Sequence, residues 1–163
     1  RIDETRVVDN RWAAEHWKSI HHHYAAAPHF ARYANIIERA YKECSEISRL
    51  SEINHKFLTL FNELLGIHTR VVWSTDHPTE GTKTLKLVGL CRALGARYYL
   101  SGPSARDYIE PRLFEEAGIQ LEYMDYSGYP PYPQCHPGFE PNVSIVDLLL
   151  NVGPEASKFL GSR

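Results

Sequence analysis

The sequence contains few cysteines, three in 163 residues, and they stand far apart at Cys44, Cys91 and Cys135. An odd number excludes a complete disulfide framework, and these spacings match no zinc-binding pattern. Cys44 and Cys91 fall at inward positions of expected helices, which predicts buried thiols. Cys135 lies in a polar loop, where a reactive thiol and an inert one are the alternatives, and no base stands beside it at a known spacing.

The chain also lacks a long apolar run and an excess of charge of one sign. No segment approaches the roughly 18 apolar residues that a membrane span requires, and no signal peptide is visible. The net charge of −2 leaves no broad basic field for duplex nucleic acid. We therefore expect a cytoplasmic protein with no membrane span and no nucleic-acid partner. The chain begins at Arg1 rather than Met, which indicates a trimmed chain or a piece of a longer one.

Apolar residues at helical spacing dominate the first part of the chain, residues 1–66. They predict three helices, with Ser51 as a cap of the third and Gly66 as its stop. The inward faces of these helices are Ala13, Trp17, Ile20 and Tyr24, then Phe30, Tyr33, Ala34, Ile37, Ala40, Tyr41 and Cys44, then Ile53, Phe57, Leu60, Phe61 and Leu64.

The pattern changes in residues 67–163, where short apolar runs alternate with helical stretches. Strands are expected at Arg70–Ser74, Arg97–Ser101 and Ile119–Tyr126, and helices at Lys83–Leu94 and Pro111–Ala117. Such alternation predicts right-handed crossovers and a parallel sheet. The expected fold class is α/β, a parallel sheet with flanking helices in a three-layer, Rossmann-like arrangement, preceded by an amino-terminal helical segment. We expect one domain over residues 1–163, with a mainly helical part at residues 1–66 and a βαβαβ part at residues 67–163.

Ligands of parallel sheets bind outside the carboxyl ends of the strands. That rule points to three loops, Thr75–Thr82, Ser101–Asp107 and Ser127–Asn142. The third contains the long Tyr-, Pro- and Gly-rich stretch 127–141, and loops of that length are functional or disordered. Its aromatic residues argue against disorder, and Asn142 or Ser144 is the expected cap of the final helix.

Two features of the first loop have both functional and structural readings. The stretch Asp76–Glu80 carries two carboxylates around His77, which suits acid–base work or a metal, or a solvated polar loop. Lys83 opens a helix after Gly81, which suits an anion contact or an ordinary capped helix start. A Walker A reading fails because the earlier glycine of that motif is absent.

The second loop joins a strand to a helix through Ser101, Gly102 and Ser104. The glycine lets the backbone approach a ligand, and Arg106 and Asp107 follow directly. The alternative is a tight turn in which Ser104 and Asp107 form a capping-box pattern.

On the first helix, Trp12 and His16 stand four residues apart and are therefore neighbours. They can line a pocket or pack at the edge of the core. The run His21–His23 does not share one helical face, since successive residues point about 100° apart, so a metal site is not expected there.

Several stretches together resemble the WbqC-like protein family over nearly the whole chain, from about Ile2 to Leu160. The residues that carry the resemblance are Trp12–Lys18, Tyr24 with Ala27–Phe30, Tyr99–Ile109, Asp125–Pro130 with Pro133-Gln134, Phe139 with Asn142–Leu149, Asn151 and Gly153. The motifs are long and occur in order.

The resemblance implies a bacterial protein of surface-polysaccharide (O-antigen) synthesis, of a kind proposed to be an acyl or glycyl transferase. It also implies that this chain lacks the family's amino-terminal part, which begins with a strand and a Gln-Pro–Tyr–Pro–Gly type turn. That part would supply another strand and further site residues.

Two hypotheses follow for function. The first is a transferase acting on a sugar or nucleotide-linked sugar, with His16, Asp107 and His77 as catalytic candidates. The second is a non-catalytic module that binds a glycan or a partner, and the aromatic residues can also serve an interface between copies of the chain. No cofactor is named by the sequence. The candidate ligand-binding residues are Trp12, Lys83, Ser101, Gly102, Ser104, Arg106, Tyr108, Tyr126, Tyr129, Tyr132, Phe139 and Asn142.

Overall fold

A computed structural model of the chain describes residues 2–161, and within it the residues gather into two compact units. The helical unit combines residues 1–68 with residues 129–163, and the strand unit is the stretch 69–128 between them. Each unit has its own buried apolar cluster. That the whole chain acts as one domain stays a prediction.

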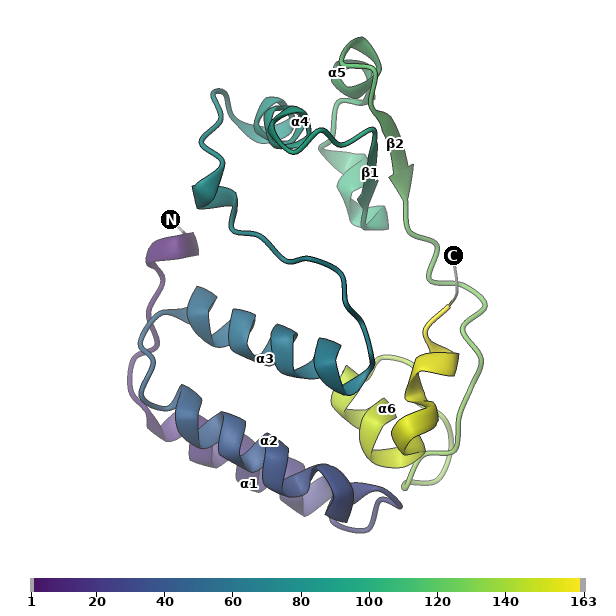
Figure 1. The fold of residues 1–163 in the computed structure, drawn as a ribbon. Helices are drawn as coiled ribbons and strands as arrows, with labels where there is room; N and C mark the ends of the chain where they lie inside the picture. Colours follow the sequence, from purple (N-terminus) through teal and green to yellow (C-terminus); the bar gives the residue numbers. More distant parts are fainter. Residues whose placement is uncertain (1, 162–163) are drawn as a thin grey trace. The chain divides into compact units, whose positions relative to one another are not determined.

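The helical unit is built from α1 (Arg11–Tyr24), α2 (Phe30–Cys44), α3 (Leu50–Leu64) and α6 (Ile145–Val152), as Figure 1 shows. Helix α2 is central, because it packs against α1, α3 and α6. Short 3-10 helices η1 (Ile2–Glu4) and η4 (Gly153–Phe159) lie beside α3 and α6. These helices confirm the three amino-terminal helices expected from the apolar periodicity.

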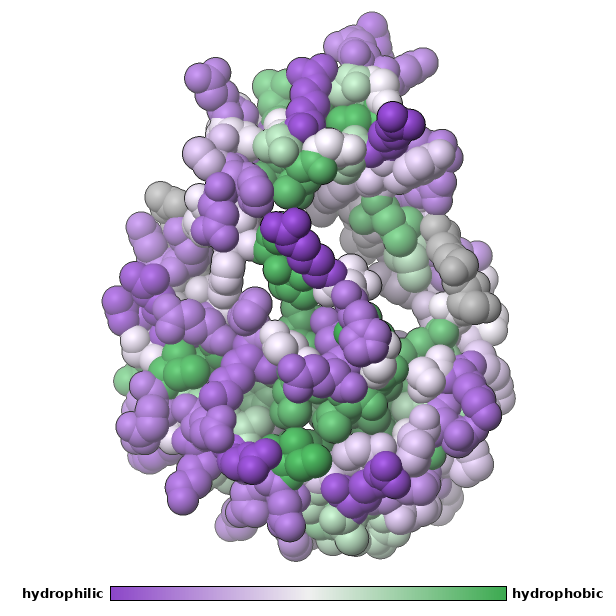
Figure 2. Space-filling view, in the orientation of Figure 1, coloured by the Kyte–Doolittle hydropathy of each residue, from purple (hydrophilic) through white to green (hydrophobic). Residues whose placement is uncertain are grey.

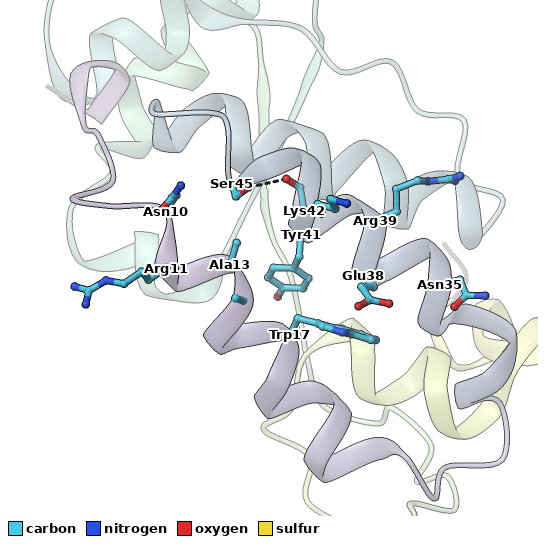
Figure 3. A pocket seen from close by; sticks show the side chains of 11 residues that line it. Asn10, Arg11, Ala13, Trp17, Asn35, Glu38, Arg39, Tyr41, Lys42 and Ser45 are labelled. Carbon is cyan, nitrogen blue, oxygen red and sulfur yellow. Dashed lines mark hydrogen bonds between the residues drawn. The ribbon is translucent and has the colours of Figure 1, made fainter.

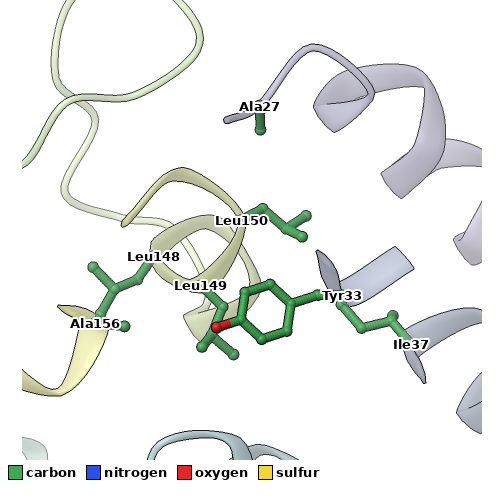
Figure 4. Close-up of a cluster of buried hydrophobic side chains, with 7 residues drawn as sticks. All are labelled: Ala27, Tyr33, Ile37, Leu148, Leu149, Leu150 and Ala156. Atoms are coloured by element: carbon green, nitrogen blue, oxygen red, sulfur yellow. The ribbon is translucent and has the colours of Figure 1, made fainter. Parts of the chain in front are cut away.

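The core of the helical unit joins α2 to α6 across more than a hundred residues of sequence (Figure 4). Ile37 on α2 and Leu149 and Leu150 on α6 are fully buried. Burying such side chains contributes about 1.5–3 kcal/mol each relative to leaving them exposed. The remaining residues of this cluster are Ala27, Tyr33, Leu148 and Ala156.

The strand unit contains α4 (Lys83–Ala93), β1 (Tyr98–Ser101), η3 (Pro103–Asp107), α5 (Pro111–Glu116) and β2 (Gln120–Tyr123), preceded by η2 (Ser74–Asp76). The two strands pair in parallel, with Tyr98 opposite Gln120 and Ser101 opposite Tyr123. The expected helices and two of the three expected strands are therefore present, which confirms a mixed helix and parallel-strand fold.

One face of the strand pair packs on helices and the other stays open within the strand unit. Tyr99 stacks on Phe114 of α5 at 5.1 Å, inside a cluster that also holds Val88 and Cys91 of α4. On the opposite face, the side chains of Tyr98 and Leu100 are 67% and 45% exposed. Among the described residues the sheet has two strands, so a three-layer, Rossmann-like arrangement is not confirmed.

The strand expected at Arg70–Ser74 is wrong. The segment is irregular until η2 begins at Ser74, although the backbone of Trp73 is extended (φ −86°, ψ 131°). A run of β-branched and aromatic residues favours an extended backbone, but a strand also needs a partner for its hydrogen bonds. The described part of β1 pairs with β2 alone, and Val71 and Trp73 remain about 40% exposed.

Helix ends follow the expected glycines but not all of the expected caps. Gly66, Gly95 and Gly118 each follow a helix end with positive φ, which confirms them as stops. The hydroxyl of Ser144 accepts a hydrogen bond from the Val146 amide and caps α6. The caps expected at Ser51 and Ser104 are wrong, because α3 already begins at Leu50 and Ser104 lies inside η3. The periodicity of apolar residues predicts that a helix is present better than it predicts the residue at which the helix begins.

Hydrophilic residues predominate on the face drawn in Figure 2, and hydrophobic ones show there in several separate places. Among the described residues, no helix has the length and apolar character that a membrane crossing requires.

Candidate functional site

The residues predicted at the carboxyl end of β1 lie beside the end of β2. Parallel pairing sets Ser101 opposite Tyr123, and the Met124 amide donates a hydrogen bond to the Ser101 carbonyl at 2.8 Å. The loops that follow both strands therefore start at the same edge. We call this edge the strand-end site, formed by Ser101, Gly102, Ser104, Arg106, Asp107, Tyr108, Tyr123 and Tyr126.

Two contacts join the loops of the strand-end site. The Arg106 guanidinium lies 4.5 Å from the centre of the Tyr123 ring, a distance typical of a cation–π interaction. Gly102 lies so close to the second loop that a Cβ there would stand 3.9 Å from the Tyr126 hydroxyl. That distance is an ordinary van der Waals contact, so the two loops lie side by side at this point.

Polar groups of the strand-end site are free to meet a ligand. Within residues 2–161, the side chains of Ser101, Ser104 and Asp107 form no hydrogen bond or ion pair. Tyr108 and Tyr126 are 64% and 59% exposed. Together they present hydroxyls, a carboxylate, a guanidinium and two aromatic rings on an open surface.

The start of α4 lies next to the chain that leaves η3. The buried Thr84 hydroxyl accepts a hydrogen bond from the Glu110 amide at 3.2 Å. Lys83, one residue earlier, has a left-handed backbone (φ 51°), which costs a non-glycine residue on the order of 1 kcal/mol. The side chain of Thr82, the residue before this helix, makes no capping hydrogen bond.

His77 lies apart from the strand-end residues, in an apolar groove of about 320 Å³ within the strand unit. Leu90 and Leu94 of α4 and Tyr98 and Leu100 of β1 form other parts of its wall. A groove of this lining suits an apolar group, with the imidazole as a polar neighbour.

Trp12 and His16 form the pair expected from their spacing, but they belong to the helical unit. Their rings meet edge to face at 5.5 Å, and both approach Tyr41 of α2. Within the described residues, the buried indole nitrogen of Trp12 has no hydrogen-bond partner. The structure does not assign His16 to one site with Asp107 or His77, which lie in the strand unit.

The long aromatic loop is anchored on α6 by two buried polar residues, Asp147 and Asn151. The Asp147 carboxylate accepts hydrogen bonds from the Tyr132 hydroxyl at 2.7 Å and from the Gln134 amide at 2.9 Å. Asn151 accepts one from the Cys135 backbone amide at 2.8 Å. The loop is therefore ordered by specific bonds, and the hydroxyl of Tyr132 is already engaged.

The same carboxylate influences the titration of its neighbours. Burial, together with the nearby Asp147 carboxylate, raises the pKa of Tyr24 to about 12. Burial and the same hydrogen-bonded carboxylate also raise the pKa of Tyr132. Burial first, and then Asp147, raises the pKa of the Cys135 thiol. A raised pKa leaves less thiolate at neutral pH, which favours an inert Cys135 over a reactive one.

Asp147 and Asn151 were not among the residues expected from the sequence, although a signal for them exists. Both interrupt an otherwise apolar run from Ile145 to Val152, and they stand four residues apart. That spacing places two polar side chains on one face of a buried helix, where each needs a partner.

The other aromatic residues of the loop have different surroundings. Tyr129 and Phe139 are 41% and 42% exposed, and Phe139 meets the Tyr132 ring edge to face at 5.4 Å. The backbone N–H of Asn142 donates a hydrogen bond to the Glu140 carboxylate at 2.7 Å. These residues belong to the helical unit, whereas Tyr126 belongs to the strand unit.

Thiols and imidazoles do not gather into a metal centre in the part of the chain that the structure describes. Cys44 and Cys91 are buried, as predicted. His21 packs against Phe30 at 5.2 Å, whereas the rings of His22 and His23 meet edge to face at 5.1 Å.

Comparison with known proteins places this chain in a family. The model of the WbqC-like protein family matches residues 1–159. The chain is 42% identical over 160 residues to a protein of Mycobacterium tuberculosis (strain ATCC 25618 / H37Rv) named "Uncharacterized protein Rv1507c". That similarity covers 98% of this chain and 69% of the relative. No solved structure matches the chain. The chain belongs to the WbqC-like protein family.

Proposed function

We propose that the strand-end site binds a sugar or a nucleotide-linked sugar, and that the chain serves an acyl- or glycyl-type transfer in the synthesis of bacterial surface polysaccharide. The observation that carries the proposal is the Arg106 guanidinium held over Tyr123, at the shared edge where both strands end. Parallel sheets bind ligands at that edge.

The groups of the site suit the chemistry of such a ligand. A guanidinium matches phosphate or carboxylate oxygens in two parallel hydrogen bonds, and Lys83 adds a second positive charge in the same unit. The exposed rings of Tyr108 and Tyr126 offer flat apolar surfaces with polar tips. Ser101 and Ser104 can hydrogen-bond hydroxyl groups.

In the transfer step, Asp107 is the candidate general base within this site. Its carboxylate would accept the proton of a sugar amine or hydroxyl as that group attacks the acyl carbonyl, and the donor's leaving group would depart. His77 and His16 are the alternative bases, and the apolar groove beside His77 suits the apolar part of an acyl donor. A cytoplasmic location and assembly of several copies belong to the same proposal.

The test is calorimetric titration of the chain with a UDP-sugar, comparing Arg106→Gln with Arg112→Gln. Arg112 is exposed on α5 and lies outside the strand-end site, so it controls for the loss of one positive charge. We expect Arg106→Gln to weaken binding at least tenfold and Arg112→Gln to leave it unchanged. Equal affinities of the two variants would overturn the site.

Asp107→Asn tests the transfer itself, with two thioesters, acetyl-CoA and glycyl-CoA, supplied as donors so that CoA is the leaving group. We expect binding of the UDP-sugar to persist and product formation to fall by a factor on the order of 100, as for the loss of a general base. Product formed at the unchanged rate would remove Asp107 from the catalytic role.

The second candidate function is a non-catalytic module for a glycan or a partner. It is favoured by the anchored loop, which holds Tyr129 and Phe139 partly exposed on a fixed backbone. In that case Phe139→Ala would weaken binding of a surface polysaccharide, Arg106→Gln would not, and no donor would yield product.

A further inference from the structure

A groove of about 800 Å³ lies between α1 and α2 in the helical unit (Figure 3). Its volume is within the range of sites that hold small molecules. The groove exists because α1 presents the small side chains of Ala13 and Ala14 to α2. Larger residues at these positions would fill the space between the helices.

Two aromatic rings line the α1–α2 groove, and each is held by a neighbour. Figure 3 shows Trp17 and Tyr41 in the space between the two helices. Trp17 stacks on Phe30 at 6.1 Å with 10° between the ring planes, and Tyr41 packs against Phe57 at 4.7 Å. Rings fixed in this way lose little freedom when a flat ligand packs on them.

The polar wall of the groove comes from α2, and several of its side chains have no partner. Asn35, Glu38 and Lys42 all line the space. Within residues 2–161, none of these three side chains forms a hydrogen bond or an ion pair. They supply an amide, a carboxylate and an ammonium group, so donors and acceptors stand on the same wall.

The charge of the groove is positive on balance. Arg11 and Arg39 line it together with Lys42, against the single carboxylate of Glu38. Arg11 is bound by Asp9 at 2.7 Å, whereas Arg39 reaches one oxygen of Glu43 only at 4.0 Å, and Lys56 binds the other oxygen at 2.6 Å. Arg39 and Lys42 are therefore available to an anionic group.

We propose that the α1–α2 groove is a second binding site, for a sugar that carries a phosphate or carboxylate group. The apolar face of the sugar ring packs on Trp17 and Tyr41. Its hydroxyls donate to Glu38 and accept from Asn35, and its anionic group meets Lys42 and Arg39. All of these residues lie in the helical unit, so the proposal does not rest on the strand-end site.

The test follows the indole N–H signals of the ¹⁵N-labelled chain by nuclear magnetic resonance during titration with glucose 1-phosphate. The chain has three tryptophans, and single Trp→Phe variants assign their signals. We expect a saturable shift of the Trp17 signal, with Trp73, in the strand unit, unmoved. The absence of a saturable shift at Trp17 with both glucose 1-phosphate and glucuronate would overturn the proposal.

Matched variants separate recognition from general charge effects. Lys42→Gln should raise the Kd at least tenfold, while Lys18→Gln, an exposed α1 lysine outside the groove, should leave it unchanged. Glu38→Gln should weaken binding of the sugar and leave the backbone amide spectrum of the folded chain unchanged. Unchanged Kd values for both groove variants would overturn the site.

Further probes define the ligand class. If both glucuronate and glucose 1-phosphate saturate the site, the groove accepts sugars with either a carboxylate or a phosphate. If one of them saturates it, the groove is specific for the anionic group of that sugar. Inorganic phosphate that binds as tightly as glucose 1-phosphate would overturn the sugar part of the proposal. Tighter binding of AMP than of either sugar would do so as well, because the aromatic rings would then serve a nucleobase.

Discussion

The two units of the chain use polar residues in opposite ways. In the helical unit, Asp147 and Asn151 are buried and fully engaged, and they hold a long loop against α6. In the strand unit, Ser101, Ser104 and Asp107 stand at a strand edge with no side-chain partner among the described residues. Polar groups with partners stabilise a fold, whereas polar groups without partners are available for binding.

The apolar residues show the same contrast. The helical unit closes its core around Ile37, Leu149 and Leu150, which are fully buried. The strand unit leaves Tyr98, Leu100 and other apolar side chains of α4 and β1 largely exposed. A cavity made in the core of the helical unit should therefore lower the free energy of unfolding more than a substitution at the surface of the strand unit.

The largest effect should come from Leu149→Ala in the helical core. Loss of a fully buried leucine should lower the free energy of unfolding by about 2–5 kcal/mol. Amide hydrogen exchange should show this loss in α2 and α6, with protection in β1 and β2 retained. Leu58→Ala, at a side chain 48% exposed on α3, is the control. Equal loss of protection in both units would show that they unfold together and would break the comparison.

A second prediction compares two glycines with positive φ, Gly153 (φ 68°, ψ −135°) and Gly128 (φ 81°). A Cβ at Gly153 would stand 2.5 Å from the His29 ring, whereas one at Gly128 would meet nothing within 4 Å. Gly128→Ala should cost about 1 kcal/mol of backbone strain, and Gly153→Ala about 1–3 kcal/mol more. Urea unfolding of both variants measures the difference, and similar midpoints would contradict the close packing at His29.

The third prediction concerns tyrosine hydroxyls in the two units. Tyr132→Phe removes a donor from the buried Asp147 carboxylate and should destabilise the chain by about 1–2 kcal/mol. Tyr126→Phe, at a ring 59% exposed in the strand unit, should change stability by less than about 0.5 kcal/mol. Thermal unfolding of both variants is the measurement. If the two changes were equal, the loop would not depend on Asp147.

The smallest expected effect is a dependence of stability on alkaline pH. Folding raises the pKa of Tyr24 from 10.0 to about 12, mainly through burial. The neutral phenol is thus favoured in the folded state, so its stabilising contribution is complete below pH 10 and is lost as the pH rises through about 12. Denaturant unfolding over this range should show a decline that is shallower in Tyr24→Phe. Identical profiles would remove Tyr24 from this role.

Much of the fold could be predicted from the sequence where local pattern and packing agree. The apolar stripe from Phe30 to Cys44 forms α2. In β2, Leu121 and Tyr123 continue the alternation that starts at Ile119, and all three contribute to the strand unit's core. The segment from Arg70 to Ser74 has strand composition but no pairing partner, because pairing depends on distant residues. Local propensity therefore predicts extended backbone better than it predicts a sheet.

Some contacts of the candidate sites could likewise be predicted from the sequence, and others depend on the folded structure. The neighbouring ends of β1 and β2 follow from parallel pairing, and the Trp12–His16 contact follows from helical spacing. The position of Arg106 over Tyr123 depends on the register of the two strands, which the sequence does not state. The anchoring by Asp147 joins residues that are 13 and 15 positions apart, through side chains whose directions only the folded loop determines.

The discontinuous helical unit has a consequence for the order of events during synthesis. Helices α1 to α3 leave the ribosome long before Leu149 and Leu150. Their apolar faces therefore remain uncovered by α6 until that helix has been synthesised. The strand unit is continuous and can complete its own cluster in the interval. The aromatic loop also emerges before Asp147 and Asn151. The stretch 129–163 therefore completes a unit whose other part, residues 1–68, is synthesised earlier, and a nascent chain stopped before α6 would leave the apolar face of α2 exposed to chaperones.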